Sequence, residues 1–354
     1  MAARPALAPP HGARRKCRAR TVCAKFMAIV SFYGVASCSA SSGQHTASRR
    51  SAGGDIPVQR LKSHSSIFTL PTKSPPPLTI MTEYGTSKNG YDDLESNSRL
   101  PFYHVHNPNF RAYLAEFVGT FILVLIGDGS VAQYVLGGGG AGHYLSVNLC
   151  WGIALLFGIH FSGGVSGGHL NPAVTLTLAM FKRFEWHKVP GYFIAQTAGA
   201  FAAAVIVFIV YYPWFDIHDP ERVTTQGIFA TYPNAQVPNW SALANEIIGT
   251  ALLISGIFAV GDQLNKPASP YTFPGAVALM LTCIGMAFGL DTGYALNPAR
   301  DFGPRLFTFF AGWGWQVWTL RDCYFWIPIV GPFVGGIVGA ATYVGLIEAH
   351  HPPQ

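Results

Sequence analysis

Six long apolar stretches constrain the fold of this chain more than any other feature of its sequence. They cover residues 112–134, 145–163, 190–212, 241–262, 273–290 and 324–347. A helix needs about 20 apolar residues to cross the hydrocarbon core of a bilayer, so each stretch can span it. Charged residues make up only 11% of the chain, against about 25% in soluble domains. The sequence therefore predicts an all-α membrane protein with six transmembrane helices.

The first hundred residues have a different composition from the rest. They contain 14 Lys and Arg but 5 Asp and Glu, and they are rich in Ser, Pro and Gly without a long periodic segment. A basic arm of this kind could bind anionic lipid or nucleic acid. A solvated arm is the simpler interpretation, and we expect no nucleic-acid partner. We predict a disordered basic cytoplasmic tail over residues 1–105, a membrane domain over 106–348 and a short C-terminal tail over 349–354.

The loops between the apolar stretches carry an uneven distribution of positive charge. If the spans alternate, five basic residues fall on one side and only Arg222 and Arg321 fall in loops on the other; the five are Arg111, Lys182, Arg183, Lys188 and Lys266. Basic loops favour the cytoplasmic side of a membrane. We therefore expect both termini to be cytoplasmic, the loop over residues 213–239 to be extracellular, and the protein to reside in the plasma membrane.

The apolar region contains an internal repeat. Residues 115–120, AEFVGT, match residues 245–250, NEIIGT, and residues 169–173, HLNPA, match residues 295–299, ALNPA. Each copy contains three spans, an odd number, so the second copy must cross the membrane in the opposite sense. An inverted 3+3 repeat of this kind has its functional site near the bilayer midplane, where broken helices meet.

The triplet Asn-Pro-Ala occurs once in each repeat, at the start of a short apolar stretch. The six residues are Asn171, Pro172, Ala173, Asn297, Pro298 and Ala299. Asn is a favoured helix N-cap and Pro is favoured at the first helical position. The stretches 171–181 and 297–310 are too short to cross a bilayer. We predict two re-entrant half-helices that meet N-terminus to N-terminus, where their dipoles disfavour cations and tolerate neutral hydroxyls. Each Asn could cap its helix and still donate N–H groups to a passing oxygen.

These motifs resemble those of the aquaporins, and among them the aquaglyceroporins such as the bacterial glycerol facilitator. The resemblance lies in residues 166–175, SGGHLNPAVT, and residues 293–305, GYALNPARDFGPR, and extends over residues 110–348. It implies a bundle of six spans and two half-helices, assembled as a homotetramer with one pore in each subunit. Residues 106–348 would then be an aquaglyceroporin channel domain.

The resemblance also implies a selectivity constriction at the extracellular side, formed by Trp151, Gly285, Tyr294 and Arg300. Arg300 offers several N–H donors and stays charged, while the two aromatic rings provide apolar surfaces. Water-selective relatives carry His at the position of Gly285, so its absence indicates a wider opening. Asp301, together with Arg305, Pro328 and Ile329, matches the glycerol-channel pattern. Tyr294 departs from that pattern, because the bacterial facilitator has Phe there, and this leaves the range of polyols open.

The remaining polar residues of the spans receive structural interpretations. We expect Glu116 and Glu246 to accept hydrogen bonds from the re-entrant loop of their own repeat, although a proton relay is the alternative. His169 and Leu170 should line or support the cytoplasmic side of the pore, and Asp301 should brace its loop, with Arg305 as a candidate partner. Asp128 and Asp291 lie near span ends and are expected to face water. The glycines at 331, 335 and 339 should permit close helix packing.

The sequence thus predicts a passive channel for glycerol and other small uncharged solutes, and for water, that excludes protons and ions. The expected partners are the permeants glycerol and water, with urea or other small polyols as further candidates, together with membrane lipid. Two alternatives share the fold: a channel mainly for water, and a non-conducting scaffold. No cofactor and no metal site is expected. The sequence shows no HExxH, GxSxG or Walker motif, and we do not expect an enzyme.

Overall fold

The computed structural model describes residues 101–353. The predicted basic tail over residues 1–105 falls almost entirely outside this range. Within it the regular elements are helices, and six of them are long and apolar enough to cross a membrane. They are α3 (Pro108–Leu136), α4 (Tyr144–Ser166), α6 (Val189–His218), α7 (Asn239–Gly261), α8 (Phe273–Thr292) and α11 (Ile327–Leu346). The prediction of six transmembrane helices is confirmed.

Three shorter α-helices accompany the spans: α5 (Pro172–Met180), α9 (Pro298–Thr308) and α10 (Gln316–Cys323). The first two begin at the Asn-Pro-Ala triplets and are the half-helices that the sequence predicts. The third belongs to an irregular segment between α9 and α11, together with the turns Phe309–Trp313 and Tyr324–Trp326. Sequence periodicity does not reveal this segment, because its helices are too short to show a repeating apolar face.

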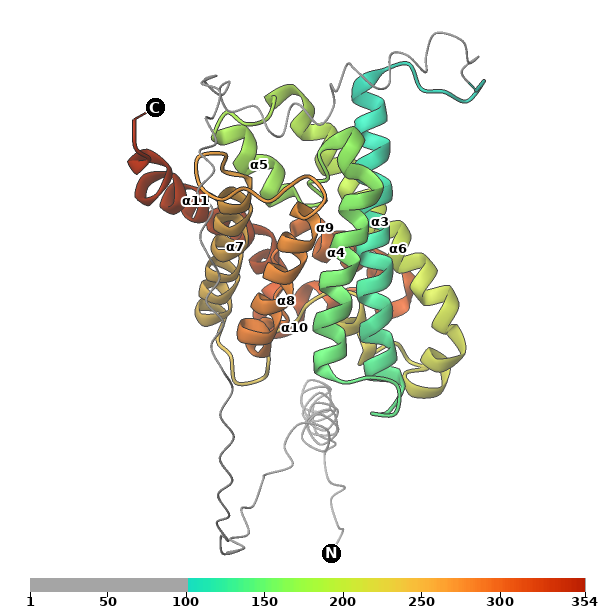
Figure 1. Cartoon of the computed structure of the whole chain (residues 1–354). Helices are drawn as coiled ribbons and strands as arrows, with labels where there is room; N and C mark the ends of the chain where they lie inside the picture. Colours follow the sequence, from blue (N-terminus) through green and yellow to red (C-terminus); the bar gives the residue numbers. More distant parts are fainter. Residues whose placement is uncertain (1–100, 354) are drawn as a thin grey trace, which may run out of the picture. The chain divides into compact units, whose positions relative to one another are not determined.

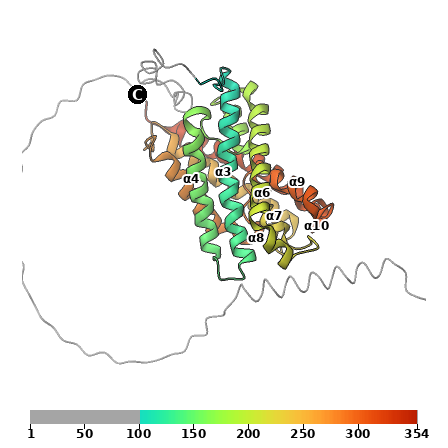
Figure 2. The ribbon, with the colours of Figure 1, turned by 90° about the vertical axis from the view of Figure 1, so that its right-hand side faces the viewer.

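The helices pack in two equivalent sets that follow the sequence repeat. Helix α3 packs against α4 and α6, and in the second half α7 packs in the same way against α8 and α11. Each half-helix crosses to the other set, since α5 contacts α11 and α9 contacts α6. Figures 1 and 2 show α3 side by side with α4 and α6, and Figure 1 shows the C-terminus on the same side as the first turn of α3. The half-helices therefore join the two repeats.

Glycines at equivalent positions allow the third span of each repeat to approach the first. A Cβ at Gly199 in α6 would lie 3.1 Å from the backbone nitrogen of Phe121 in α3, and one at Gly335 in α11 would lie 3.1 Å from the carbonyl carbon of Ile247 in α7. Both distances are shorter than ordinary Cβ contacts, so a larger residue would push the helices apart. The predicted close packing of the last span is present at Gly335.

The outer surface of the bundle is apolar. One face of α4 exposes large side chains at a spacing of four residues: Leu149, Ile153, Phe157 and Phe161. A soluble monomer rarely exposes an apolar patch of this extent. In a bilayer the same surface faces lipid or another copy of the chain without cost, which agrees with an integral membrane protein.

Helix α6 continues past the end that the sequence suggested. A loop was expected from residue 213, but the helix runs through Pro213 to His218. Proline inside a helix removes one hydrogen bond. Packing in the last turn offsets this loss, because Phe215 is fully buried and its ring lies 5.4 Å from that of Phe208 and 5.5 Å from that of Phe229. Tertiary contacts thus extend the helix beyond its local preference.

Asp219 organises the connection that follows α6. Its carboxylate accepts hydrogen bonds from the backbone N–H groups of Val223, Thr224 and Thr225 and from the Thr225 hydroxyl, at 2.7–2.9 Å. Burial alone would raise the pKa of Asp219, but these hydrogen bonds outweigh it and hold the pKa below its ordinary value. The carboxylate therefore fixes the turn that leads to Phe229, whose carbonyl accepts a hydrogen bond from Arg300.

The chain end beyond α11 contacts the body of the protein. The His351 ring nitrogen Nε2 lies 2.6 Å from Oδ2 of Asp262, which also accepts a hydrogen bond from the Tyr343 hydroxyl. Arg183 and Glu348 form an ion pair. Burial alone would raise the pKa of Asp262, but the hydrogen bonds to its carboxylate together outweigh burial and lower the pKa. The segment predicted as a short C-terminal tail is thus held in place as far as His351.

Candidate functional site: a pore between two opposed half-helices

Two asparagines begin the half-helices and cap them in the same way. The side-chain oxygen of Asn171 accepts a hydrogen bond from the backbone N–H of Ala173 at 2.8 Å. That of Asn297 accepts from the N–H groups of Ala299 and Arg300, at 3.0 and 3.2 Å. Proline follows each cap, where its missing N–H costs nothing. The local sequence thus dictates where each half-helix starts.

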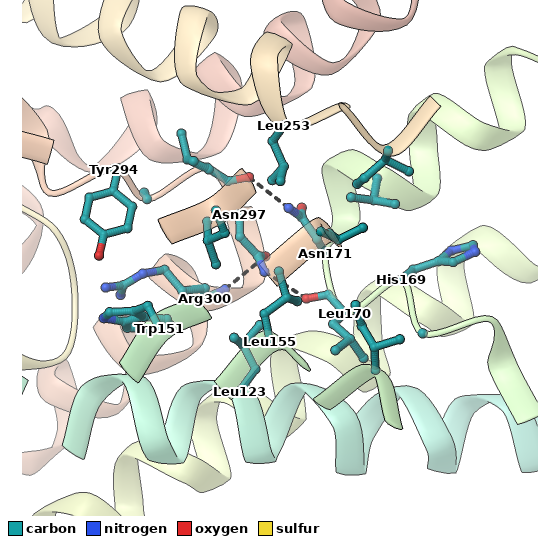
Figure 3. Close-up of a pocket in the computed structure, with 18 of the residues that line it drawn as sticks. Leu123, Trp151, Leu155, His169, Leu170, Asn171, Leu253, Tyr294, Asn297 and Arg300 are labelled. Atoms are coloured by element: carbon teal, nitrogen blue, oxygen red, sulfur yellow. Dashed lines mark hydrogen bonds between the residues drawn. The ribbon is translucent and has the colours of Figure 1, made fainter. Parts of the chain in front are cut away.

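The two caps also bind each other's loops. Nδ2 of Asn171 donates to the carbonyl of Leu296, and Nδ2 of Asn297 donates to the carbonyl of Leu170, both at 2.8 Å. Figure 3 shows this reciprocal pair between the two facing helix starts. One N–H of each amide is therefore committed to the protein, and the second N–H is what remains for a passing oxygen. This cross-link could not be foreseen from the sequence, because the contact depends on how the repeats dock.

A buried glutamate holds each re-entrant loop. Glu116 accepts hydrogen bonds from the backbone N–H groups of His169 and Leu170, at 2.9 and 2.7 Å. Glu246 accepts from those of Ala295 and Leu296, at 3.0 and 2.9 Å. These are the hydrogen bonds that the repeat leads one to expect.

The glutamates stabilise an unusual backbone conformation. Leu170 and Leu296 have φ values of 54° and 52°, in a region that costs a branched residue roughly 1–2 kcal/mol. Both side chains are buried, and Gly119 and Gly249 leave room for them, because a Cβ at either glycine would overlap the leucine. The conformation points the backbone N–H groups to the glutamates and the carbonyls to the opposing asparagines.

A pocket runs along the junction between the two half-helices. His169 lies at one end and Trp151, Tyr294 and Arg300 lie at the other, with the two asparagines between them (Figure 3). Most of the lining is apolar and comes from Leu123, Leu155, Ile159, Val174, Leu253, Ile257, Val277 and Leu281. The pocket therefore offers an apolar surface on several sides and polar groups at few, separated positions.

Three of the four residues assigned to the constriction meet at one end of this pocket. The guanidinium carbon of Arg300 lies 4.2 Å from the centre of the Trp151 ring, and Nη1 donates to the carbonyl of Phe229 at 3.1 Å. Within residues 101–353, the hydrogen bonds of the Arg300 side chain involve Nη1 alone. Nε and Nη2 thus remain available to a solute, beside an aromatic ring.

Gly285, the fourth residue, lies behind the pocket. A Cβ at this position would lie 2.6 Å from Cζ of Tyr294 and would also overlap the Asn148 side chain. From the sequence, Gly285 was expected to leave an open space. In the structure the Tyr294 ring occupies that space. The chain before Asn297 folds back against α8, which brings the Tyr294 ring against Gly285. Because Gly285 has no side chain, the ring can lie there.

The remaining predicted site residues, His169 and Asp301, lie near the N-terminal ends of α5 and α9. His169 lines the pocket, and its Nδ1 lies 3.1 Å from the Thr175 hydroxyl. Asp301 is fully buried outside the pocket, where it binds Arg305 through two nitrogen–oxygen contacts of 2.8 and 3.1 Å and accepts two hydrogen bonds from Thr231. Asp301 thus braces the half-helix instead of facing the pore.

Asp128 is a functional candidate that sequence reasoning placed wrongly. It was expected to face water near a span end, but its side chain is fully buried, and Oδ1 lies 3.7 Å from Nη1 of Arg300. The error arose because α3 extends to Leu136, which puts Asp128 more than two turns from the helix end. The sequence signal that could have indicated its burial is the position of an acid inside an apolar stretch.

Asp291, the other acid expected to face water, is half-buried at the end of α8.

Six membrane-crossing helices around two half-helices that meet at their capped ends define a membrane channel protein. The chain belongs to the major intrinsic protein family, whose model matches residues 104–343. It is 46% identical over 244 residues to Aquaglyceroporin-2 of Rhizophagus irregularis, a match covering 67% of this chain and 77% of that protein. It is 42% identical to human Aquaporin-9, covering 68% and 83% of the two chains.

A solved structure shares the fold. The X-ray structure of the aquaglyceroporin from Plasmodium falciparum is 34% identical, with a TM-score of 0.63, and the match covers 68% of this chain and 97% of that one. The family consists of channels and not of enzymes. The expected family and the expected absence of catalytic function both agree with these comparisons.

Proposed function

We propose that the protein is a passive channel for glycerol and other small uncharged solutes, including urea and short polyols, and for water. One observation carries this proposal: the guanidinium of Arg300 and the rings of Trp151 and Tyr294 lie together at one end of a mostly apolar pocket. A polyol has a CH side that suits the rings and hydroxyls that can accept from the arginine. The names of the similar proteins, aquaglyceroporins among them, support the same assignment.

The constriction would act by hydrogen bonding and shape. Arg300 uses Nη1 to bind the Phe229 carbonyl, so Nε and Nη2 can donate to two successive hydroxyls. The rings of Trp151 and Tyr294 would offer apolar contact to the CH side of a polyol, and their bulk would exclude solutes that are too large for the opening. The carbonyl-bound Nη1 keeps the guanidinium from turning freely, which lowers the entropy lost when a solute binds.

Exclusion of ions and protons would arise at the two half-helices and at Arg300. Each half-helix places roughly half a positive charge at its N-terminus, and the caps Asn171 and Asn297 bring these ends together. A permeant oxygen that accepts from both asparagines has its lone pairs occupied. It is then poorly placed to relay a proton along a water file.

The family and the apolar surface also support a proposal for the assembly and the membrane placement of the protein. We propose a homotetramer with one pore in each subunit, in the plasma membrane, with both termini cytoplasmic. The exposed apolar face of α4 would contact lipid or a neighbouring subunit. The basic residues Arg111, Lys182 and Lys266 lie at or beyond the helix ends on the side that would face the cytoplasm.

The test is solute flux into proteoliposomes. Vesicles with the full chain, vesicles with a form that lacks residues 1–100, and protein-free vesicles are compared by stopped-flow light scattering with water, glycerol, urea and a longer polyol. We expect glycerol entry well above the protein-free rate, without an ion gradient. Equal glycerol entry with and without protein would refute the proposal.

A channel mainly for water is the second candidate, and one feature of the site favours it. The Tyr294 ring fills the space beside Gly285, and Arg300 contacts the Trp151 ring, which narrows the opening. The same experiment separates the two, because a water channel would raise osmotic shrinkage without raising glycerol entry. A non-conducting scaffold would raise neither.

A further inference from the structure

Asp128 is a buried acid without a hydrogen-bond partner. Its side chain is fully buried in α3, and neither carboxylate oxygen has a partner among residues 101–353. A buried carboxylate is costly unless a positive charge or donors compensate for it. Other buried acids of the chain are compensated in this way, as Glu116 and Glu246 are by backbone N–H groups. Asp128 therefore needs a separate explanation.

The nearest positive charge is Arg300 of the constriction. Oδ1 of Asp128 lies 3.7 Å from Nη1 of Arg300, the nitrogen that donates to the Phe229 carbonyl. Asp301, the next residue in the chain after Arg300, cannot serve as its counter-charge, because it is fully engaged by Arg305 and Thr231. Within residues 101–353, Asp128 is the acid that forms an ion pair with Arg300.

The same turn of α3 also accommodates Trp151. A Cβ at Gly127 would lie 2.5 Å from three atoms of the Trp151 ring, so only glycine leaves room for the ring here. Gly127 thus positions one side of the constriction, and the neighbouring Asp128 lies beside the guanidinium that contacts that ring. Two consecutive residues of the first repeat support a constriction whose arginine comes from the second.

We propose that Asp128 is a positioning residue of the pore: its carboxylate is the counter-charge of Arg300 and holds the guanidinium back against Trp151 and the Phe229 carbonyl. The inference rests on the proposed channel function. With Asp128 in place, the guanidinium stays at the side of the opening and presents Nε and Nη2 to a solute. Without the charge, Arg300 keeps its contacts with the Phe229 carbonyl and the Trp151 ring but loses its counter-charge. Its long side chain then enters the opening more often, where it obstructs glycerol more than the smaller water molecule.

The decisive variant is Asp128→Asn, which keeps the shape of the side chain and removes its charge. We expect the glycerol-to-water permeability ratio in proteoliposomes to fall about threefold or more, the size of coupling expected between interacting side chains. Asp128→Glu should keep a ratio nearer to that of the wild type, because it retains the charge. If Asp128 served only to fill space, the order would reverse, since Asn is isosteric and Glu is larger.

A double-mutant cycle identifies the partner. In an Arg300→Gln background, Asp128→Asn should leave the permeability ratio unchanged, because the charge that it compensates is gone. A matched control is Thr120→Val, which removes another fully buried side-chain oxygen without a partner from the same helix. It should leave the ratio unchanged in both backgrounds.

Failed folding does not leave the proposal open. If Asp128→Asn alone prevents assembly, the double variant with Arg300→Gln should recover folded protein, measured as monodisperse material after size exclusion in detergent, because both charges are then absent. A double variant no better than the single one would overturn the inference, as would an unchanged ratio in folded Asp128→Asn. Wild-type vesicles that fail to admit glycerol would instead refute the channel function itself.

Discussion

The two halves of this channel are alike at their centre and different at their ends. At the centre, Asn171 and Asn297 each cap a half-helix and each donate to the opposite loop at 2.8 Å. Glu116 and Glu246 hold those loops through equivalent backbone N–H groups. These contacts, which fix the opposed half-helices, thus occur twice, once in each repeat.

At the ends the repeats diverge. The half-helix α5 of the first repeat carries no charged residue, whereas α9 of the second carries Arg300, Asp301 and Arg305. The loop before α5 contributes His169 to the pocket, and the loop before α9 contributes Tyr294. Contacts that build the fold are therefore duplicated, and the groups expected to select solutes occur in one copy. This difference predicts which substitutions should have matching effects in the two halves.

The largest effects should come from removing the buried glutamates. Glu116→Ala and Glu246→Ala each leave two backbone N–H groups without an acceptor, and each orphaned donor costs about 1–3 kcal/mol. We expect each substitution to lower the free energy of unfolding by about 3–5 kcal/mol and to leave little folded protein in size-exclusion profiles. Glu→Gln at the same positions retains one acceptor oxygen, so its stability should lie between those of the wild type and the alanine variant. A large loss in one half only would show that the two loops are not held equivalently.

Removing either asparagine should have a smaller and again symmetrical effect. Asn171→Ala and Asn297→Ala each lose a helix cap, worth about 0.5–2 kcal/mol, and leave the opposing leucine carbonyl without its donor. We expect similar decreases in thermal stability, measured by unfolding in detergent, of about 1–3 kcal/mol. If the two cross-links act as one unit, the double variant should lose less stability than the sum of the losses in the two single variants. Additive losses would contradict the reciprocal arrangement.

Much of this central symmetry could be predicted from the sequence, because it depends on local patterns. Apolar length gives the six spans, Asn-Pro gives the starts of α5 and α9, and the matching Glu116 and Glu246 indicate equivalent roles. The contacts across repeats could not be predicted, since the Asn171 bond to Leu296 and the burial of Asp128 depend on how two segments dock. The extension of α6 beyond Pro213 likewise depends on aromatic packing around Phe215.

Substitutions at the constriction should have effects that no substitution in the other repeat reproduces. Gly285→Ala adds a Cβ where the Tyr294 ring lies 2.6 Å away, and overpacking of this kind costs about 1–3 kcal/mol. The ring should move into the opening and obstruct glycerol. We expect glycerol permeability to fall about tenfold, which corresponds to about 1.4 kcal/mol added to the barrier for passage. Water permeability should fall less. The measurement is paired glycerol and water flux in one vesicle preparation.

A control for Gly285 comes from a glycine that faces open space. A Cβ added at Gly275, near the start of α8, would meet no atom within 4 Å, and Gly275→Ala should leave both fluxes unchanged. Equal losses of water and glycerol permeability in Gly285→Ala would mean that the substitution disturbs folding and does not move Tyr294 into the opening.

The smallest effects are expected at two buried tyrosines, one beside each end of the pore. The Tyr192 hydroxyl donates to the carbonyl of Ser166 at 2.7 Å, whereas the buried Tyr294 hydroxyl has no partner within residues 101–353. Tyr192→Phe should therefore lower stability by about 1 kcal/mol, the usual worth of one hydrogen bond. Tyr294→Phe should leave stability unchanged or raise it by less than about 1 kcal/mol, because it removes an uncompensated buried hydroxyl. The measurement is a melting curve for each variant. A larger loss of stability for Tyr294→Phe than for Tyr192→Phe would show that the Tyr294 hydroxyl is bound within the pore, for instance by permeating solvent. The hydroxyl oxygen would then contribute to selection as well as the ring.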